Sequence, residues 1–311
     1  MNDVILPSKL QKGDTVGIVS PSNPVTEDLK PQFDKGVSFL RSLGFEVSLG
    51  RNALKIDDYS AGTPEEKGED MNSMFANPEI KAIICSKGGE NANSCLPFLD
   101  WNIIKSNPKI FLGISDITVL LNAIYHKTGM ITFHGNDVMW GFGSEHSEYD
   151  EQEFTERLVE GRTGKINRNS EWSTVREGVA EGRLVGGNIH SLMKANGTEY
   201  FPDFEGKILF LEAYEITPAG CDSVFHQLKQ ISVFDKIEGV IVGYIYSMQT
   251  SKKPIAQMED ILLKTTKEYS FPILKANDFG HNCPNTVLPV GAKAKIDSGR
   301  KEIEIIEKCV I

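Results

Sequence analysis

The run Thr15-Val16-Gly17-Ile18-Val19-Ser20 opens the first of several alternating strand and helix patterns. It is rich in β-branched residues and is ended by Pro21, as expected of a buried strand. Apolar residues then recur at helical spacing between positions 33 and 43, and Gly44 stands where a left-handed C-terminal cap is expected. Residues 45–47 form the next expected strand, so the chain begins with a strand-helix-strand unit.

Further units of the same kind follow along the first half of the chain. Thr63-Pro64-Glu65-Glu66 reads as an N-cap, a first-position proline and a capping-box glutamate at the start of a helix. The apolar run 80–86 leads into a helix near residues 93–99, and the run 110–113 leads into a helix over about 116–127. Such alternation predicts an α/β fold with a parallel sheet covered by helices.

A change in composition suggests where this first domain ends. The sequence from about residue 144 to 176 is polar and rich in charge, and it loses its apolar period after a short helix near residues 152–158. We expect a linker near residues 162–180, between an α/β domain over 1–165 and a second domain over 180–311.

The second domain is expected to be smaller and rich in β-structure. One helix is indicated by apolar residues on a single face between Cys221 and Ile231. The expected strands are residues 208–211, 239–242, 271–274, 286–290 and 302–306.

Composition and charge exclude several classes of protein. The 311 residues include 33 Lys and Arg against 43 Asp and Glu, a net charge of −10, so nucleic acid is not an expected partner. No segment has the ~20 apolar residues of a membrane span, and the first residues do not resemble a secretion signal, so no membrane contact and a cytoplasmic location are expected. The five cysteines are scattered and are read as reduced thiols, with no spacing suited to zinc.

The segment Leu112-Gly113-Ile114-Ser115-Asp116-Ile117-Thr118 places a serine at an abrupt junction between an apolar strand and a helix. A sharp turn there would expose the Ser115 hydroxyl and aim the backbone N–H of Asp116 at a developing oxyanion. The segment departs from Gly-x-Ser-x-Gly, however, and a serine followed by an acidic residue is also a common helix N-cap.

A nucleophilic serine needs a general base and a group that orients the base. His281 follows the apolar run 271–274 at the carboxyl end of an expected strand, where sites of α/β proteins collect. Glu212 ends the strand 208–211 in the same way, and a carboxylate there would need a partner such as an imidazole, unless it is a surface glutamate. His134 and His190 each follow an apolar segment and are read as hydrogen-bonded packing residues.

A glycine turn, Ser86-Lys87-Gly88-Gly89-Glu90-Asn91, follows a third strand. Its paired glycines would let backbone N–H groups approach a ligand closely, although an ordinary turn is an equal alternative. Neither the phosphate-binding pattern Gly-x-x-x-x-Gly-Lys-Ser/Thr nor Gly-x-Gly-x-x-Gly is present, so nucleotide binding of those kinds has no specific support.

Taken together, these segments resemble the LD-carboxypeptidase family of serine peptidases, which includes the microcin C immunity amidases. The resemblance spans nearly the whole chain and depends on the order and spacing of its motifs. They are the opening segment Lys12 to Ser22, Gly88-Gly89, Gly113-Ile114-Ser115-Asp116, Gly186-Gly187-Asn188, Leu211-Glu212 and Asp278-Phe279-Gly280-His281.

The resemblance implies a catalytic triad with Ser115 as nucleophile, His281 as general base and acid, and Glu212 as the carboxylate that orients it. It assigns the oxyanion donors to the backbone N–H groups of Asp116 and of the Gly88-Gly89 turn. It also implies an amino-terminal α/β sheet domain, a smaller β-rich carboxyl-terminal domain that supplies Glu212 and His281, a homodimer, and no metal or organic cofactor.

Departures from the family pattern bear on the substrate. The glycine turn has Lys87 where the murein-recycling branch has arginine, and the amides of Asn91 and Asn93 offer neutral donors and acceptors to a ligand. Ala213 stands where aspartate is common in the family. Trp172, in the expected linker, is a candidate for stacking on a nucleobase, although an exposed packing role is the alternative.

The leading hypothesis is therefore a serine hydrolase that cuts an amide beside a free or activated carboxyl end. Its substrate would be a small murein peptide that loses a terminal D-amino acid, or an aminoacyl-nucleotide of the microcin C type. The alternative is a non-catalytic protein that binds a small anion or a nucleotide on the same scaffold. A metallohydrolase is disfavoured because clustered ligand spacings are missing from the sequence.

Overall fold

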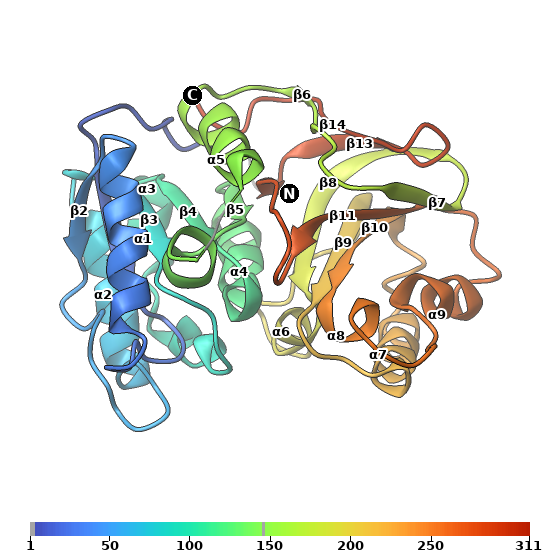
Figure 1. The fold of residues 1–311 in the computed structure, drawn as a ribbon, viewed down its shortest axis with the longest axis horizontal. Helices are drawn as coiled ribbons and strands as arrows, with labels where there is room; N and C mark the ends of the chain where they lie inside the picture. The colour runs from blue at the N-terminus through green and yellow to red at the C-terminus, as the bar shows by residue number, and fades with distance from the viewer. Residues whose placement is uncertain (1–3, 145–146) are drawn as a thin grey trace.

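A computed structural model describes residues 4–144 and 147–311 and shows two α/β domains side by side, each built on its own sheet (Figure 1). The first sheet has the strand order β12-β5-β4-β3-β1-β2 and is parallel except for β12. Its strands are β1 (Thr15–Val19), β2 (Glu46–Leu49), β3 (Ile80–Cys85), β4 (Ile110–Gly113), β5 (Thr132–His134) and β12 (Leu288–Val290).

Helices cover both faces of this sheet, as the alternating sequence predicts (Figure 1). They are α1 (Lys30–Ser42), α2 (Pro64–Ala76), α3 (Trp101–Ser106) and α4 (Thr118–Thr128). The capping box of Thr63 and Glu66 is present at the start of α2, and Gly44 follows α1 at a φ of 93°. The helix expected near residues 93–99 is a 3-10 helix over Ala92–Phe98, and Pro97 lies inside it.

The second sheet has eight strands in the order β6-β14-β13-β8-β9-β10-β11-β7. Its central strands β8 to β11 are parallel, and the strands at its two ends pair antiparallel. The strands are β6 (Gly164–Lys165), β7 (Trp172–Arg176), β8 (Val179–Asn188), β9 (Lys207–Ala213), β10 (Ile237–Ile245), β11 (Ile273–Gly280), β13 (Lys293–Asp297) and β14 (Glu302–Ile305). The helices are α6 (Ile189–Met193), α7 (Pro218–Gln230), α8 (Tyr246–Gln249) and α9 (Met258–Thr265).

The segment expected to be a linker over residues 162–180 is part of the second sheet. It contributes β6 and β7, and β7 pairs antiparallel with β11. Short edge strands of this kind carry no long apolar run, which is why the composition suggested a linker. Before them lie α5 (Glu148–Phe154) and a π-helical turn over Thr155–Val159, where the sequence predicted one short helix.

The two domains share strands and core. Strand β12 follows β6 to β11 of the second sheet in the sequence, yet it belongs to the first sheet, where it pairs with β5. Helix α4 lies between the two sheets (Figure 1), and most of its residues are buried. One apolar cluster runs from Ile83 and Leu120 to Phe210 and Leu274, so the domains are joined by a continuous core. No helix in the described ranges is long and apolar enough to cross a membrane.

Helix α1 packs closely against the π-helical segment Val138–Phe142 of the first domain, and Gly36 lies at the point of contact. A Cβ at Gly36 would collide with the carbonyl oxygen of Val138. We expect Gly36→Ala to lower the free energy of unfolding by about 1–3 kcal/mol. Lys35→Ala, exposed on the same helix, is the control and should change it by less than ~0.5 kcal/mol. Equal denaturation midpoints for the two variants would contradict this packing.

Candidate active site

Ser115 lies in a strained turn between β4 and α4. Its φ is 64°, in the left-handed region that residues with a side chain seldom adopt, whereas Ile114 before it is extended. The glycine turn packs directly against it. A Cβ at Gly88 would lie 2.6 Å from the Ser115 Cβ, 2.9 Å from its Oγ and 3.2 Å from the backbone nitrogen of Asp116. Only a glycine therefore allows the two loops to approach this closely.

The Asp116 side chain anchors this turn from behind. It is fully buried and forms an ion pair with Lys194, which follows α6 in the second domain. The other carboxylate oxygen accepts hydrogen bonds from the Ser22 hydroxyl at 2.5 Å and the Ala92 backbone N–H at 2.7 Å. Lys194 also donates to the carbonyl oxygen of Glu90 at 2.8 Å. One carboxylate thus fixes the serine turn, the glycine-turn loop and the second domain to one another.

Glu212 and His281 are in contact, although 69 residues of the chain separate them. Glu212 lies near the end of β9 and His281 directly follows β11. The Nδ1 atom of His281 is 2.6 Å from Oε2 of Glu212, whose side chain is 0% exposed. The buried carboxylate expected at this strand end therefore has the imidazole partner that its burial requires.

The two charges stabilise each other. Burial opposes ionisation of Glu212, but the charge and hydrogen bond of His281 outweigh it and lower the pKa of Glu212. Burial would likewise lower the pKa of His281, but the charge and hydrogen bond of Glu212, together with the charge of Asp137, raise it above the ordinary 6.5. The contact therefore favours an imidazolium beside a carboxylate.

His134 lies on the far side of Glu212, a position that the sequence did not predict. Its Nε2 is 4.0 Å from Oε1 of Glu212, and its ring packs edge-on against Phe210 and Phe279. It is a packing residue as expected, but its nitrogens lack the expected hydrogen bonds, since neither has a partner among the described residues. Burial lowers the pKa of His134 to about 4, so it is a neutral imidazole at neutral pH.

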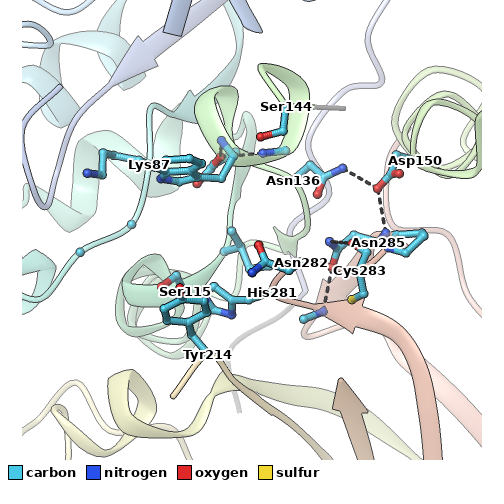
Figure 2. A pocket seen from close by; sticks show the side chains of 18 of the residues that line it. Lys87, Ser115, Asn136, Ser144, Asp150, Tyr214, His281, Asn282, Cys283 and Asn285 are labelled. Atoms are coloured by element: carbon cyan, nitrogen blue, oxygen red, sulfur yellow. Dashed lines mark hydrogen bonds between the residues drawn. The ribbon is translucent and has the colours of Figure 1, made fainter. Parts of the chain in front are cut away.

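A cavity of about 760 Å³ opens in front of Ser115 and His281 (Figure 2). Gly88 and Gly89 also line it, as the sequence predicted for residues near a ligand. The lining residues that sequence reasoning missed include Asn23, Asn136, Asp137, Trp140, Asp150, Tyr214, Cys283 and Asn285. In the described part of the chain, no group of three or more His, Cys, Asp or Glu side chains is arranged to hold a metal ion.

Three predicted substrate contacts do not line this cavity. The Asn91 side chain accepts a hydrogen bond from the buried Lys67 at 2.8 Å, so it supports the glycine-turn loop instead, and Asn93 is exposed elsewhere. Trp172 is 1% exposed on β7 and donates its Nε1–H to Asp278 at 2.7 Å. Both expectations for Trp172, a nucleobase platform and an exposed packing residue, are wrong because β7 turns the side chain into the core.

Tyr214 and Trp140 are the exposed aromatic residues of the cavity, 42% and 52% exposed. The Tyr214 ring lies 5.3 Å from the His281 ring and stacks on Tyr246 at 5.0 Å and 8° (Figure 2 shows Tyr214 beside His281). Asn136 and Asp137, two of the missed lining residues, follow the carboxyl end of β5, just as Ser115 follows that of β4. The strand-end rule would have found Asn136 and Asp137 had it been applied there.

A chain of hydrogen bonds holds the loop that carries His281 (Figure 2). Asp150, in the first turn of α5, accepts hydrogen bonds from the Asn136 side chain at 2.7 Å and the Asn285 backbone N–H at 2.8 Å. The Asn285 side chain in turn accepts the N–H of Gly280, next to His281, at 2.8 Å. The position of His281 is therefore tied to the first domain as well as to the second sheet.

The strained serine, the buried Glu–His pair and the shared cavity define the type of site found in serine hydrolases. Residues 16–135 match the model of the LD-carboxypeptidase N-terminal domain and residues 181–296 match that of its C-terminal domain. This chain belongs to the LD-carboxypeptidase family, and it is a peptidase-type enzyme. Membership of this enzyme family favours the leading hypothesis, a serine hydrolase, over the alternative of a non-catalytic binding protein.

Two relatives named for different substrates are similarly close. The microcin C7 self-immunity protein MccF of Escherichia coli is 34% identical over 98% of this chain and 96% of its own length. The probable murein peptide carboxypeptidase of Bacillus subtilis is 32% identical over 95% and 92%. A structure of MccF in complex with glutamyl sulfamoyl guanosine superposes with a TM-score of 0.90 at 34% identity, covering 98% of this chain and 99% of that one.

The Glu212 contact makes a testable difference to His281. We expect the His281 imidazole, followed by NMR, to titrate above the ordinary 6.5. Glu212→Gln should lower this pKa, because it removes the negative charge that opposes the effect of burial. Asp222→Asn removes the carboxylate beside the exposed His226 and should leave His281 unchanged. A His281 pKa that is the same with and without the Glu212 carboxylate would contradict this geometry.

Trp172→Phe tests the corrected position of the tryptophan. Loss of one donor to the buried Asp278 carboxylate should lower the free energy of unfolding by about 1–3 kcal/mol. Because Trp172 does not line the cavity, KM should stay within about twofold of wild type for any nucleotide-containing substrate. A large increase in KM with unchanged stability would restore Trp172 as a ligand contact.

Proposed function

We propose that Ser115, His281 and Glu212 form a catalytic triad that cleaves an amide bond. The observation that carries the proposal is the contact between Nδ1 of His281 and Oε2 of Glu212, beside the cavity that also contains Ser115. This contact occupies Nδ1 and leaves Nε2 to take the proton from the Ser115 hydroxyl. Neutral His281 is the active form, so protonation at low pH stops the reaction.

The reaction proceeds in two halves. Ser115 Oγ attacks the amide carbonyl, and the backbone N–H groups of Asp116 and of the Gly88-Gly89 turn stabilise the oxyanion that forms. His281 gives the proton to the leaving nitrogen, and the C–N bond breaks to leave an acyl-enzyme. A water molecule, deprotonated by His281, then hydrolyses the ester and regenerates the Ser115 hydroxyl. No step uses a metal or an organic cofactor.

For the substrate we propose an aminoacyl-nucleotide amide, with a murein tetrapeptide as the second candidate. The exposed rings of Trp140 and Tyr214 offer a planar leaving group a stacking surface, and the described lining residues include amides but no arginine to clamp a terminal carboxylate. The name of the microcin C7 self-immunity protein fits the first substrate, and the name of the murein peptide carboxypeptidase fits the second. The homodimer and the cytoplasmic location remain predictions from the family resemblance and the sequence.

The first test compares the two substrates. We expect the protein to hydrolyse an aminoacyl-sulfamoyl adenosine with a kcat/KM at least equal to that for a murein tetrapeptide ending in L-Lys-D-Ala, at equal enzyme concentration. Release of D-alanine without detectable nucleotide cleavage would instead assign the enzyme to murein peptides.

The second test removes the nucleophile. Ser115→Ala should lower kcat on the order of 10³-fold or more, because only positioning and oxyanion stabilisation remain. Ser94→Ala, on the 3-10 helix behind the glycine turn and outside the cavity lining, is the matched control and should keep near-normal kcat. Circular dichroism would show that both variants fold, and near-normal turnover by Ser115→Ala would remove Ser115 from the mechanism.

A further inference from the structure

Asp137 is a buried carboxylate of the cavity wall that the proposed mechanism does not use. It lies just beyond the carboxyl end of β5 and is 1% exposed. Its Oδ1 caps the segment Val138–Phe142 by accepting the backbone N–H groups of Trp140 at 2.7 Å and Gly141 at 3.1 Å. Its Oδ2 has no hydrogen-bond partner among the described residues, although the residue lines the cavity.

The charges around Asp137 do not neutralise it directly. Lys87 and His281 line the same cavity and their charges favour the ionised form of Asp137, but neither forms an ion pair with it. Burial dominates and raises the pKa of Asp137 to about 6. A carboxylate with one free oxygen in a sheltered cavity has an incomplete set of partners, and a ligand with hydrogen-bond donors and positive charge would complete it.

An ammonium group is the ligand chemistry that fits best. It carries three donors and a positive charge, whereas a phosphate or a substrate carboxylate would be repelled by Asp137. The neutral amide of Asn136, which precedes Asp137, is held by Asp150 and so does not compete for the free oxygen. Ser115 and Asp137 line the same cavity, so the residue whose carbonyl Ser115 attacks enters the cavity that also holds the free Asp137 oxygen.

We propose that Asp137 is the ammonium-binding residue of this cavity and that the enzyme selects acyl groups that carry a free amino group. The inference rests on the proposed function for the identity of the acyl group. Two sources share this chemistry: the α-amino group of an aminoacyl-nucleotide and the side-chain amino group of a diamino acid in a murein peptide. If Asp137 served only as a helix cap, its charge would contribute nothing to the difference in affinity between the free and the acetylated ligand.

Binding measured by calorimetry tests this directly, with Ser115→Ala as the background so that the ligand is not consumed. The probes are glutamyl-sulfamoyl adenosine, its α-N-acetyl derivative, a murein tetrapeptide with L-lysine at the third position, and its Nε-acetyl derivative. We expect acetylation to weaken binding at least about tenfold in the pair whose amino group Asp137 holds, a difference of ~1.4 kcal/mol. The pair that responds identifies the source of the amino group.

Asp137→Asn in the same background should remove that preference. Asparagine keeps the Oδ1 acceptor for the cap but loses the charge, so affinity for the free amine should fall to that of the acetylated ligand, whose own affinity should change little. Asp100→Asn is the matched control, because Asp100 caps α3 through the same kind of contacts outside the cavity lining. It should leave the preference intact.

The outcomes separate the two proposals. Equal affinity for free and acetylated ligands, no binding of any of the four probes, or a preference that survives Asp137→Asn would each overturn the role of Asp137. Amine-selective binding that disappears in Asp137→Asn, without hydrolysis of either parent ligand by the wild-type protein, would support Asp137 and contradict the proposed hydrolase reaction.

Discussion

The rest of the site depends on the buried carboxylate of Asp116. A fully buried charge is stable only when it is paired and hydrogen-bonded, and here its partners come from three separate loops and from both domains. Lys194 brings the charge from the second domain, while Ser22 and Ala92 fix the loops that follow β1 and β3. Because Asp116 directly follows Ser115, the same contacts hold the serine in its strained conformation and keep the glycine turn against it.

A second buried carboxylate, Glu212, organises the opposite side of the cavity. Its contact with His281 and the nearby neutral ring of His134 place one acid between two imidazoles of very different basicity. The difference follows from surroundings: His281 reaches the cavity and makes a direct hydrogen bond, whereas His134 packs among phenylalanine rings. The link from Asp150 through Asn285 to Gly280 ties this pair to the first domain, so both halves of the site are fixed across the domain boundary.

The sequence predicted what depends on local pattern and on strand ends. Ser115, Glu212 and His281 each lie at the end of an apolar strand. Parallel strands bring Glu212 and His281 to one edge of the second sheet, and Ser115 lies at the corresponding edge of the first sheet. It did not predict contacts made by side chains distant in the chain, such as Lys194 with Asp116 or Lys67 with Asn91. Trp172 was misjudged because β7 is a short edge strand in polar sequence, and its inward face is set by pairing with β11. The return of β12 to the first sheet has no local signal either.

Labelling with a fluorophosphonate, read by intact mass and peptide mapping, tests the central claim most directly. The account predicts one adduct per chain, on Ser115, because this residue lines the cavity and the Glu212–His281 pair makes its hydroxyl nucleophilic. Labelling should slow markedly when His281 is replaced by alanine. The absence of an adduct under conditions that label a control serine hydrolase, or an adduct on another serine, would contradict the account.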